Sequence, residues 1–339
     1  MPHNPPNSIR NIAIVGATGQ LGKYITAALL QNPTFRITAL TRSTNSSSFP
    51  PGLTPIPVDY SEPSTLTAAL KGQDALIITL AVAAPPDTQS KLIRAAAEAR
   101  VPWILPNEFG GDTDDPVSDE TRMGPPKRAA RKLIEELGVS SWFGIVSGFW
   151  YEYSLSGPGL YGIDIAKREV VWFDDGTQRL NTSTWVQIGR AVASLLALPV
   201  GEGTSGGAGA GAGADVATLS SYRNRLVFVS SFAVNQREML DSINRVMGLE
   251  DKDWTLTRVG AKKRFEDAGK KLAGGDRMSY AYLLYTRYFF LGEDASLFEK
   301  TKRLDNKKLN LPTEDLDDAT RKAVEMAQEG YFSKLSYSR

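Results

Sequence analysis

Three glycines follow a short apolar run near the N-terminus at a spacing suited to holding a phosphate. Asn11–Val15 reads as a buried strand, Gly16, Gly19 and Gly22 follow it at intervals of three, and residues 23–30 have a helical composition. These glycines would permit a sharp turn, a close approach of backbone to a pyrophosphate, and tight packing of the helix on the sheet. The free N–H groups and the dipole of the helix N-terminus also favour an anion. The alternative is a glycine-rich turn that binds nothing. The predicted dinucleotide contacts are Gly16, Thr18, Gly19, Gln20, Leu21 and Gly22.

The residues after the second expected strand, 36–40, distinguish NADPH from NADH. An acidic side chain there would bond the ribose 2′-hydroxyl of NADH, but the chain continues with Thr41, Arg42 and Ser43. Arg42 offers a permanent planar charge suited to a phosphate, and the neighbouring hydroxyls add donors. We therefore expect NADPH as the coenzyme, with Arg42 and Ser43 at its 2′-phosphate. The alternative for Arg42 is a solvated surface side chain.

Two further positions are expected around the adenosine. Asp59 ends the third expected strand, 54–58, and would either meet the adenine amino group or cap a helix. Ala81 begins a loop after the fourth strand, and this loop is expected to pass under the adenosine.

A lysine at the start of an expected helix is a candidate for proton transfer. Lys127 lies in the first turn of a helix predicted over 126–137, where the positive end of the helix dipole lowers the pKa of its ammonium. Arg131, one turn later, acts in the same direction. A lysine biased toward neutrality can exchange a proton near neutral pH. From these residues alone, Lys127 could equally be one member of an exposed basic cluster with Arg128, Arg131 and Lys132.

Composition excludes several other chemistries. The 339 residues include no cysteine, and the one histidine, His3, lies in a tail over residues 1–8 that we expect to be disordered. Thiolate catalysis, a Ser-His-Asp triad and a cysteine or histidine metal site are therefore not expected, and no metal is predicted. The net charge of +1 argues against nucleic acid as a partner. The N-terminus has no apolar signal core, and no run approaches the roughly 18 apolar residues of a membrane span, so a soluble, cytoplasmic protein is expected.

Alternating strand and helix patterns over residues 9–150 predict an α/β domain with a doubly wound parallel sheet, the Rossmann arrangement. The strands are short and apolar, as strands buried on both faces should be. Strands are expected at 11–15, 36–40, 54–58, 75–80, 103–105 and 142–146, and helices at 23–30, 63–70, 88–99 and 126–137.

The second half, 151–335, predicts a smaller α+β lobe that covers the carboxyl edge of the sheet and binds the substrate. Asn181, Thr182 and Ser183 are candidate caps for the helix over 184–196. Residues 201–217 are rich in glycine and alanine and predict a flexible insertion. Strands are expected at 170–173, 226–229 and 254–259, and helices at 184–196, 236–247, 261–272, 279–291 and 315–328.

Three motifs resemble one protein family. The run Gly16-Ala-Thr-Gly-Gln-Leu-Gly22, Pro106-Asn-Glu-Phe-Gly110 and Lys127-x-x-x-Arg131 are similar to the NmrA-like branch of the atypical short-chain dehydrogenases. This branch includes isoflavone reductase and the pinoresinol-lariciresinol and phenylcoumaran benzylic ether reductases. The segments 147–155, 173–176 and 181–185 resemble most closely the fungal isoflavone-reductase-like oxidoreductases of the CipA type. The resemblance covers roughly residues 9–330.

The resemblance implies roles for residues near the nicotinamide. The lysine that corresponds to Lys127 is the proposed catalytic acid or base of the plant reductases. Asn107 stands where those enzymes usually carry a serine, and Phe109 is expected to pack beside the nicotinamide. The chain has no Tyr-x-x-x-Lys motif, so the tyrosine–lysine chemistry of ordinary short-chain dehydrogenases is disfavoured.

An aromatic run after the sixth strand is expected to bind the substrate. Phe149, Trp150, Tyr151 and Tyr153 would suit a flat aromatic or terpenoid molecule, and the two tyrosines are also candidate proton donors. The alternative is a packing cluster between the lobes. Glu108 is also expected at the substrate.

The leading hypothesis is an NADPH-dependent reductase of an aromatic or polycyclic secondary metabolite, acting on a C=C, quinone-methide-like or C=N bond. Lys127 would supply the proton, directly or through water, and the protein would be a monomer or homodimer with a small molecule as its partner. One alternative is a non-enzymatic NAD(P) redox sensor, because the founding member of the family binds dinucleotide without turnover and controls a transcription factor. Another is an isomerase, dehydratase or cyclase that keeps the fold without redox chemistry.

Overall fold

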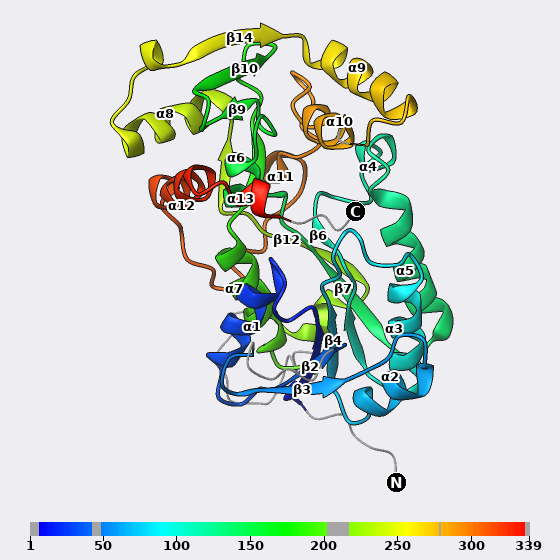
Figure 1. The fold of residues 1–339 in the computed structure, drawn as a ribbon. Helices are drawn as coiled ribbons and strands as arrows, with labels where there is room; N and C mark the ends of the chain where they lie inside the picture. Colours follow the sequence, from blue (N-terminus) through cyan, green and yellow to red (C-terminus); the bar gives the residue numbers. More distant parts are fainter. Residues whose placement is uncertain (1–6, 43–48, 202–216, 278, 336–339) are drawn as a thin grey trace.

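Short apolar strands assemble into one parallel sheet at the centre of the molecule (Figure 1). The computed structural model describes residues 7–42, 49–201, 217–277 and 279–335. The strand order is β12-β7-β5-β4-β1-β2-β3, with β6 beside β7, and every pairing is parallel. The doubly wound sheet is therefore confirmed. The strands are β1 (Asn11–Val15), β2 (Arg36–Thr41), β3 (Leu53–Pro57), β4 (Ala75–Ile78), β5 (Trp103–Leu105), β6 (Phe109–Gly110), β7 (Ser141–Val146) and β12 (Arg225–Phe228).

Both faces of the sheet are covered by helices, because the strand side chains alternate between two apolar layers. Ile12 and Ile14 pack in the core cluster that contains residues of α1 and α7. Ala13 and Val15 pack in the cluster that contains residues of α2, α3 and α5. Figure 1 shows these two groups of helices on opposite sides of the sheet. Their bounds are α1 (Gly22–Leu30), α2 (Pro63–Leu70), α3 (Thr88–Glu98), α5 (Gly124–Leu137) and α7 (Trp185–Leu196).

The sheet extends beyond the six expected strands. β12, expected as a strand of the second lobe, pairs with β7 instead, and the two-residue β6 was not expected. α7 also comes from the second half of the sequence and packs on α1. Gly189 allows this approach, because an added Cβ would lie 2.6 Å from the Tyr24 carbonyl oxygen. An apolar pattern predicts that a strand or helix exists, but it does not identify the partner.

The rest of the second half forms a smaller lobe with an aromatic core. It has two three-stranded sheets, β14-β10-β9 and β13-β11-β8. Its strands are β8 (Phe149–Trp150), β9 (Ile163–Asp164), β10 (Glu169–Phe173), β11 (Leu180–Ser183), β13 (Phe232–Val234) and β14 (Thr255–Val259). The remaining helices are α4 (Val117–Glu120), α6 (Tyr151–Ser156), α8 (Gln236–Met247), α9 (Ala261–Ala273), α10 (Ser279–Arg287), α11 (Phe298–Thr301), α12 (Leu316–Gln328) and α13 (Tyr331–Lys334), with 3-10 turns at Leu219–Tyr222 and Asp251–Asp253.

The prediction of the residues that cap α7 was wrong. Asn181, Thr182 and Ser183 belong to β11, and the N-cap is Thr184, whose hydroxyl accepts from the Gln187 N–H at 2.9 Å. Residues 202–216 of the expected insertion and residues 1–6 of the expected tail, with His3, lie outside the described residues. Across the described ranges, no helix has the length and apolar character needed to span a membrane.

The segment from Gly16 to Gly22, called the glycine loop below, is built from backbone contacts that leave no room for side chains at its first and last glycines. Gly16 has φ +78°, and an added Cβ would lie 2.0 Å from the Thr79 carbonyl oxygen. A Cβ on Gly22 would lie 1.9 Å from the Gly16 carbonyl oxygen. The turn after β1 and the start of α1 are therefore pressed against the end of β4, as the spacing of the glycines predicted.

Replacing Gly22 with alanine should lower the free energy of unfolding by at least about 2 kcal/mol, because backbone has to move to relieve the contact. Urea denaturation measures this. Gly274→Ala is the control, since its added Cβ would meet only ordinary contacts, 3.4 Å and longer, and it should change stability by less than about 0.5 kcal/mol. Equal effects of the two substitutions would contradict the tight loop.

Candidate active site

One cavity of about 580 Å³ lies along the carboxyl ends of the sheet strands, where the second lobe covers them. Its walls come from the glycine loop, the ends of β4 and β5, the start of α5, and the aromatic residues of β8 and α10. Carboxyl ends of parallel strands are the usual place for ligands in this architecture. The expected residues that line it are Gly19, Gln20, Leu21, Gly22, Ala81, Asn107, Phe109, Lys127, Phe149, Trp150 and Tyr153.

The glycine-loop end of the cavity offers unused backbone donors. Within the described ranges, no backbone carbonyl accepts from the N–H groups of Gln20, Leu21 or Gly22. The first turn of α1 has no side-chain cap and no acidic residue. Such a helix start suits a phosphate or pyrophosphate. Gly16 shapes the turn beneath, and Thr18 is exposed beside the cavity without lining it.

Arg42 and Asp59, both expected around the adenosine, do not line the cavity. Arg42 is exposed directly after β2, close enough to Tyr60 for its charge to oppose the rise that burial causes in the pKa of that phenol. Ser43 lies outside the described residues. Asp59 is exposed and accepts from the Ser61 N–H and hydroxyl at 2.8 and 2.6 Å, contacts that lower the pKa of its carboxyl. It thus shapes the turn before α2, whose N-cap is Glu62.

Asn107 ties two strand ends together at the floor of the cavity. Its Oδ1 accepts from the Leu80 N–H at 3.2 Å, and its Nδ2 donates to the Leu80 carbonyl at 3.3 Å. Its own N–H donates to Gln89 Oε1 at 2.7 Å. The polar group at this position therefore holds the β4 and β5 ends in register, with Phe109 two residues further along the same wall.

Lys127 reaches the cavity from the first turns of α5. Its Nζ lies against Gly110, where an added Cβ would be 3.7 Å away. Burial is the main cause that lowers the pKa of its ammonium; Arg131 adds to the decrease and Glu108 opposes it. The expected direction and the contribution of Arg131 are thus confirmed, although burial outweighs both neighbouring charges. Among the described residues, no group forms a hydrogen bond or ion pair with Nζ.

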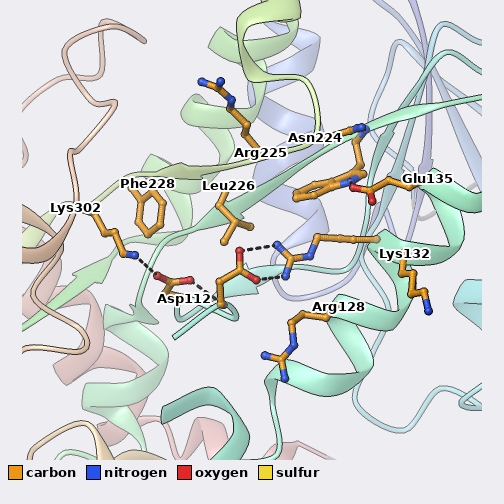
Figure 2. A pocket seen from close by; sticks show the side chains of 12 residues that line it. Asp112, Arg128, Lys132, Glu135, Asn224, Arg225, Leu226, Phe228 and Lys302 are labelled. Carbon is orange, nitrogen blue, oxygen red and sulfur yellow. Dashed lines mark hydrogen bonds and ion pairs between the residues drawn. The ribbon is translucent and has the colours of Figure 1, made fainter. Parts of the chain in front are cut away.

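The rest of the basic cluster faces a second depression, of about 540 Å³ (Figure 2). There Arg131 is bound through two guanidinium nitrogens by the Asp114 carboxylate and lies 4.8 Å from the Trp142 ring centroid. Arg128 pairs with Asp119. Lys127 alone of the cluster lines the main cavity, so the cluster is not a single solvated face.

Two residues expected at the substrate lie elsewhere. Glu108 is 1% exposed and turns away from the main cavity toward α5; its Oε1 accepts from Thr113, and its Oε2 is 3.7 Å from Arg131 Nε. Tyr151 is fully buried in the second lobe, with its hydroxyl 2.7 Å from Thr320 Oγ1. Both corrections have the same cause, because successive residues of a strand or at a helix start point in different directions.

The part of the cavity that was expected to bind the substrate has an aromatic wall, formed by Phe149, Trp150, Tyr153, Tyr285 and Tyr288. Phe149 stacks on Tyr285 at a centroid distance of 4.2 Å and meets the edge of Tyr288 at 5.4 Å. Burial raises the pKa of Tyr288 to about 12, so its hydroxyl stays a donor at physiological pH. The cavity also includes Met123, Leu284, Tyr285 and Tyr288, which were not expected. The density of tyrosines over 279–290 is the one signal in the sequence for Tyr285 and Tyr288.

Comparison with known proteins identifies relatives of this chain and structures that share its fold. The NmrA-like family model matches residues 9–158. The oxidoreductase poxI of Penicillium oxalicum is 30% identical over 264 residues, which are 76% of each chain. A crystal structure of isoflavone reductase covers 93% of this chain and 99% of its own at 20% identity, with a TM-score of 0.70. A structure of AtPrR2 with NADP+ and (+)pinoresinol covers 93% and 98% at 18% identity, with a TM-score of 0.67.

A buried carboxyl beside the aromatic wall makes stability depend on pH. Glu152 is 5% exposed and accepts from the Trp185 N–H at 3.2 Å. Burial raises the pKa of this carboxyl from 4.5 to about 7. The folded state therefore keeps the proton between these values while the unfolded state releases it, so the stabilisation is complete below about pH 4.5 and is lost as the pH rises to about 7.

Glu152→Gln should remove a decline on the order of 2–3 kcal/mol in the free energy of unfolding between pH 4.5 and 7. Urea denaturation across this range measures it. Glu299→Gln, at an exposed position, is the control and should keep the wild-type profile. A profile that is unchanged in Glu152→Gln would show that this carboxyl ionises normally.

Proposed function

The chain belongs to the NmrA-like family of isoflavone-reductase-like proteins, and from that premise we propose that it is an NADPH-dependent reductase of an aromatic or polycyclic metabolite. The observation that carries the proposal is that the glycine loop, Lys127 and the aromatic wall all line one cavity. A phosphate-binding helix start, a proton donor and a surface for flat rings are the parts that such a reduction needs.

The glycine loop fits a dinucleotide, because its Cβ-free backbone and unused N–H groups form a cradle for a pyrophosphate. Arg42, exposed at the end of β2, is the group proposed for the 2′-phosphate, and Ser43 and Ala81 would contribute nearby. Asn107 and Phe109 would flank the nicotinamide. NADPH supplies a hydride when bound.

Lys127 is the proposed proton donor. The ammonium holds its proton beside Gly110, and loss of that proton leaves a neutral amine in a buried environment that favours the uncharged form. Transfer to the substrate, directly or through one water, is therefore helped by the burial that lowers the pKa. Histidine is absent from the described part of the chain, so the lysine is the cationic proton donor of this cavity.

The aromatic wall supports a flat substrate. Phe149, Tyr285 and Tyr288 form a cluster of rings at one end of the cavity, and Trp150 and Tyr153 complete it. The volume of the cavity is in the usual range for small-molecule sites. We therefore propose reduction of a C=C, quinone-methide-like or C=N bond conjugated to an aromatic ring.

Lys127→Met should lower turnover by roughly 100-fold or more, because it keeps the unbranched stem of the side chain and removes the ammonium that carries the proton. Affinity for NADPH should change little. Deuterium transfer from 4-deuterated NADPH to enone and quinone-type acceptors identifies a working substrate and then measures turnover. Lys132→Met, on the exposed face of α5, is the control. Unchanged turnover in Lys127→Met would refute the role of this lysine.

Arg42→Ala should weaken NADPH binding by about 10- to 100-fold and leave NADH binding nearly unchanged, because a charge-assisted contact exists only with the 2′-phosphate. Titration of the wild type and the variant with NADPH, NADP+, NADH and NAD+ tests this. Arg36→Ala, at the exposed start of β2, is the control. Equal loss of affinity for NADPH and NADH would refute the phosphate contact. A strong preference of the wild type for the oxidised coenzymes would favour a sensor. In the acceptor assay, a product without two added hydrogens would favour non-redox chemistry.

A further inference from the structure

The last described helix contacts the glycine loop, although the two are far apart in sequence. Gln20 Nε2 donates to the Tyr331 hydroxyl at 3.1 Å. Gln20 lines the cavity between two glycines of the loop, and Tyr331 is the first residue of α13. Gly330 adopts φ +65° and turns the chain from α12 into α13. The C-terminal segment is thus directed back over the start of α1.

The same segment contacts the aromatic wall of the second lobe. The Phe332 ring lies 4.7 Å from the Tyr153 ring, and Leu335 lines the cavity itself. Gly157 permits this packing, because an added Cβ would lie 2.8 Å from Phe332 Cζ. α13 therefore spans from the coenzyme end to the substrate end of the cavity, at the junction of the sheet and the smaller lobe (Figure 1).

The two aromatic residues of α13 pack in different cores. Tyr331 joins the cluster that contains α1 and α7 residues, where its ring is 6.4 Å from Trp185. Phe332 joins the cluster of the second lobe. Ser333 and Lys334, by contrast, are exposed. These contacts all lie on one side of a four-residue helix, which is an arrangement that can detach locally without unfolding the rest.

We propose that Tyr331–Leu335 is part of the coenzyme site and acts as a strap, which holds Gln20 and the glycine loop in place and must detach before the dinucleotide leaves. The inference rests on the dinucleotide binding proposed above. Because linkage of binding free energies is reciprocal, a strap that also strengthens coenzyme binding must itself be stabilised by bound coenzyme. A segment that served only to pack the two lobes together would show neither effect.

Three variants separate these possibilities. Tyr331→Phe removes only the hydroxyl that accepts from Gln20, and a chain that ends at Gly330 removes the whole segment. Lys334→Arg is the matched control, since it alters an exposed side chain of the same helix and keeps its charge. Displacement of bound NADPH in a stopped-flow fluorimeter gives the dissociation rate. Hydrogen exchange of residues 16–30, measured without coenzyme, reports independently on the loop.

Tyr331→Phe should raise the NADPH dissociation rate about three- to tenfold, the range expected for one lost hydrogen bond, and the shortened chain should raise it further. Both should increase exchange over residues 16–24, and NADPH should reduce exchange of 331–335 in the wild type. Lys334→Arg should match the wild type throughout.

An unchanged dissociation rate in Tyr331→Phe and in the shortened chain would overturn the strap, even if thermal stability fell. If the shortened chain does not fold, Tyr331→Phe decides. If the wild type binds no NADPH, the proposed function fails, and hydrogen exchange alone tests the contact between Tyr331 and the glycine loop. Unchanged protection of residues 16–24 in Tyr331→Phe and in the shortened chain would overturn that contact. Increased exchange of these residues would support it.

Discussion

The contact of backbone with backbone at the glycine loop is the constraint on which the site depends. Gly16 and Gly22 bring the end of β1, the start of α1 and Thr79 at the end of β4 into a contact that no side chain could enter. Thr79 adds a hydrogen bond of 2.6 Å from its hydroxyl to the Val15 carbonyl. The helix start is therefore fixed relative to two neighbouring strands, and its free N–H groups have one direction in space.

Packed aromatic rings connect α1 to the residues that line the cavity. α7 lies against α1 because Gly189 allows it, and Trp185 at the start of α7 stacks on Tyr24 at 5.3 Å. Trp185 also packs at 6.2 Å from both Trp150 and Tyr153, which line the cavity. The aromatic run after β7 thus packs between the lobes and also lines the cavity. The two interpretations of this run, a substrate-binding surface and a packing cluster between the lobes, are therefore compatible.

Much of the fold could be predicted from periodicity, and less of the site. The bounds of β1, β5, α2 and α8 agree with the expected ranges because apolar runs and flanking turn residues mark them locally. β12, α13 and the tyrosines of α10 were not assigned to the sheet or the cavity, because only contacts between distant parts of the chain put them there. The prediction that Glu108 and Tyr151 line the substrate site was wrong for a similar reason, because a motif identifies residues but does not determine where their side chains point.

Pairing, rather than burial, distinguishes two neighbouring cations on one helix. Arg131 is held by Asp114, Glu108 and the face of Trp142, so its charge is matched and fixed. Lys127, one turn earlier, has no such partner among the described residues and is placed in the cavity. An unmatched ammonium in a buried site is unstable as a charge and is therefore ready to lose its proton. Because Trp150 Nε1 donates to the Phe109 carbonyl at 2.9 Å, the strand beside this lysine is also tied to the aromatic wall. A sheet edge thus sets the separation between Lys127 and the aromatic rings of the cavity.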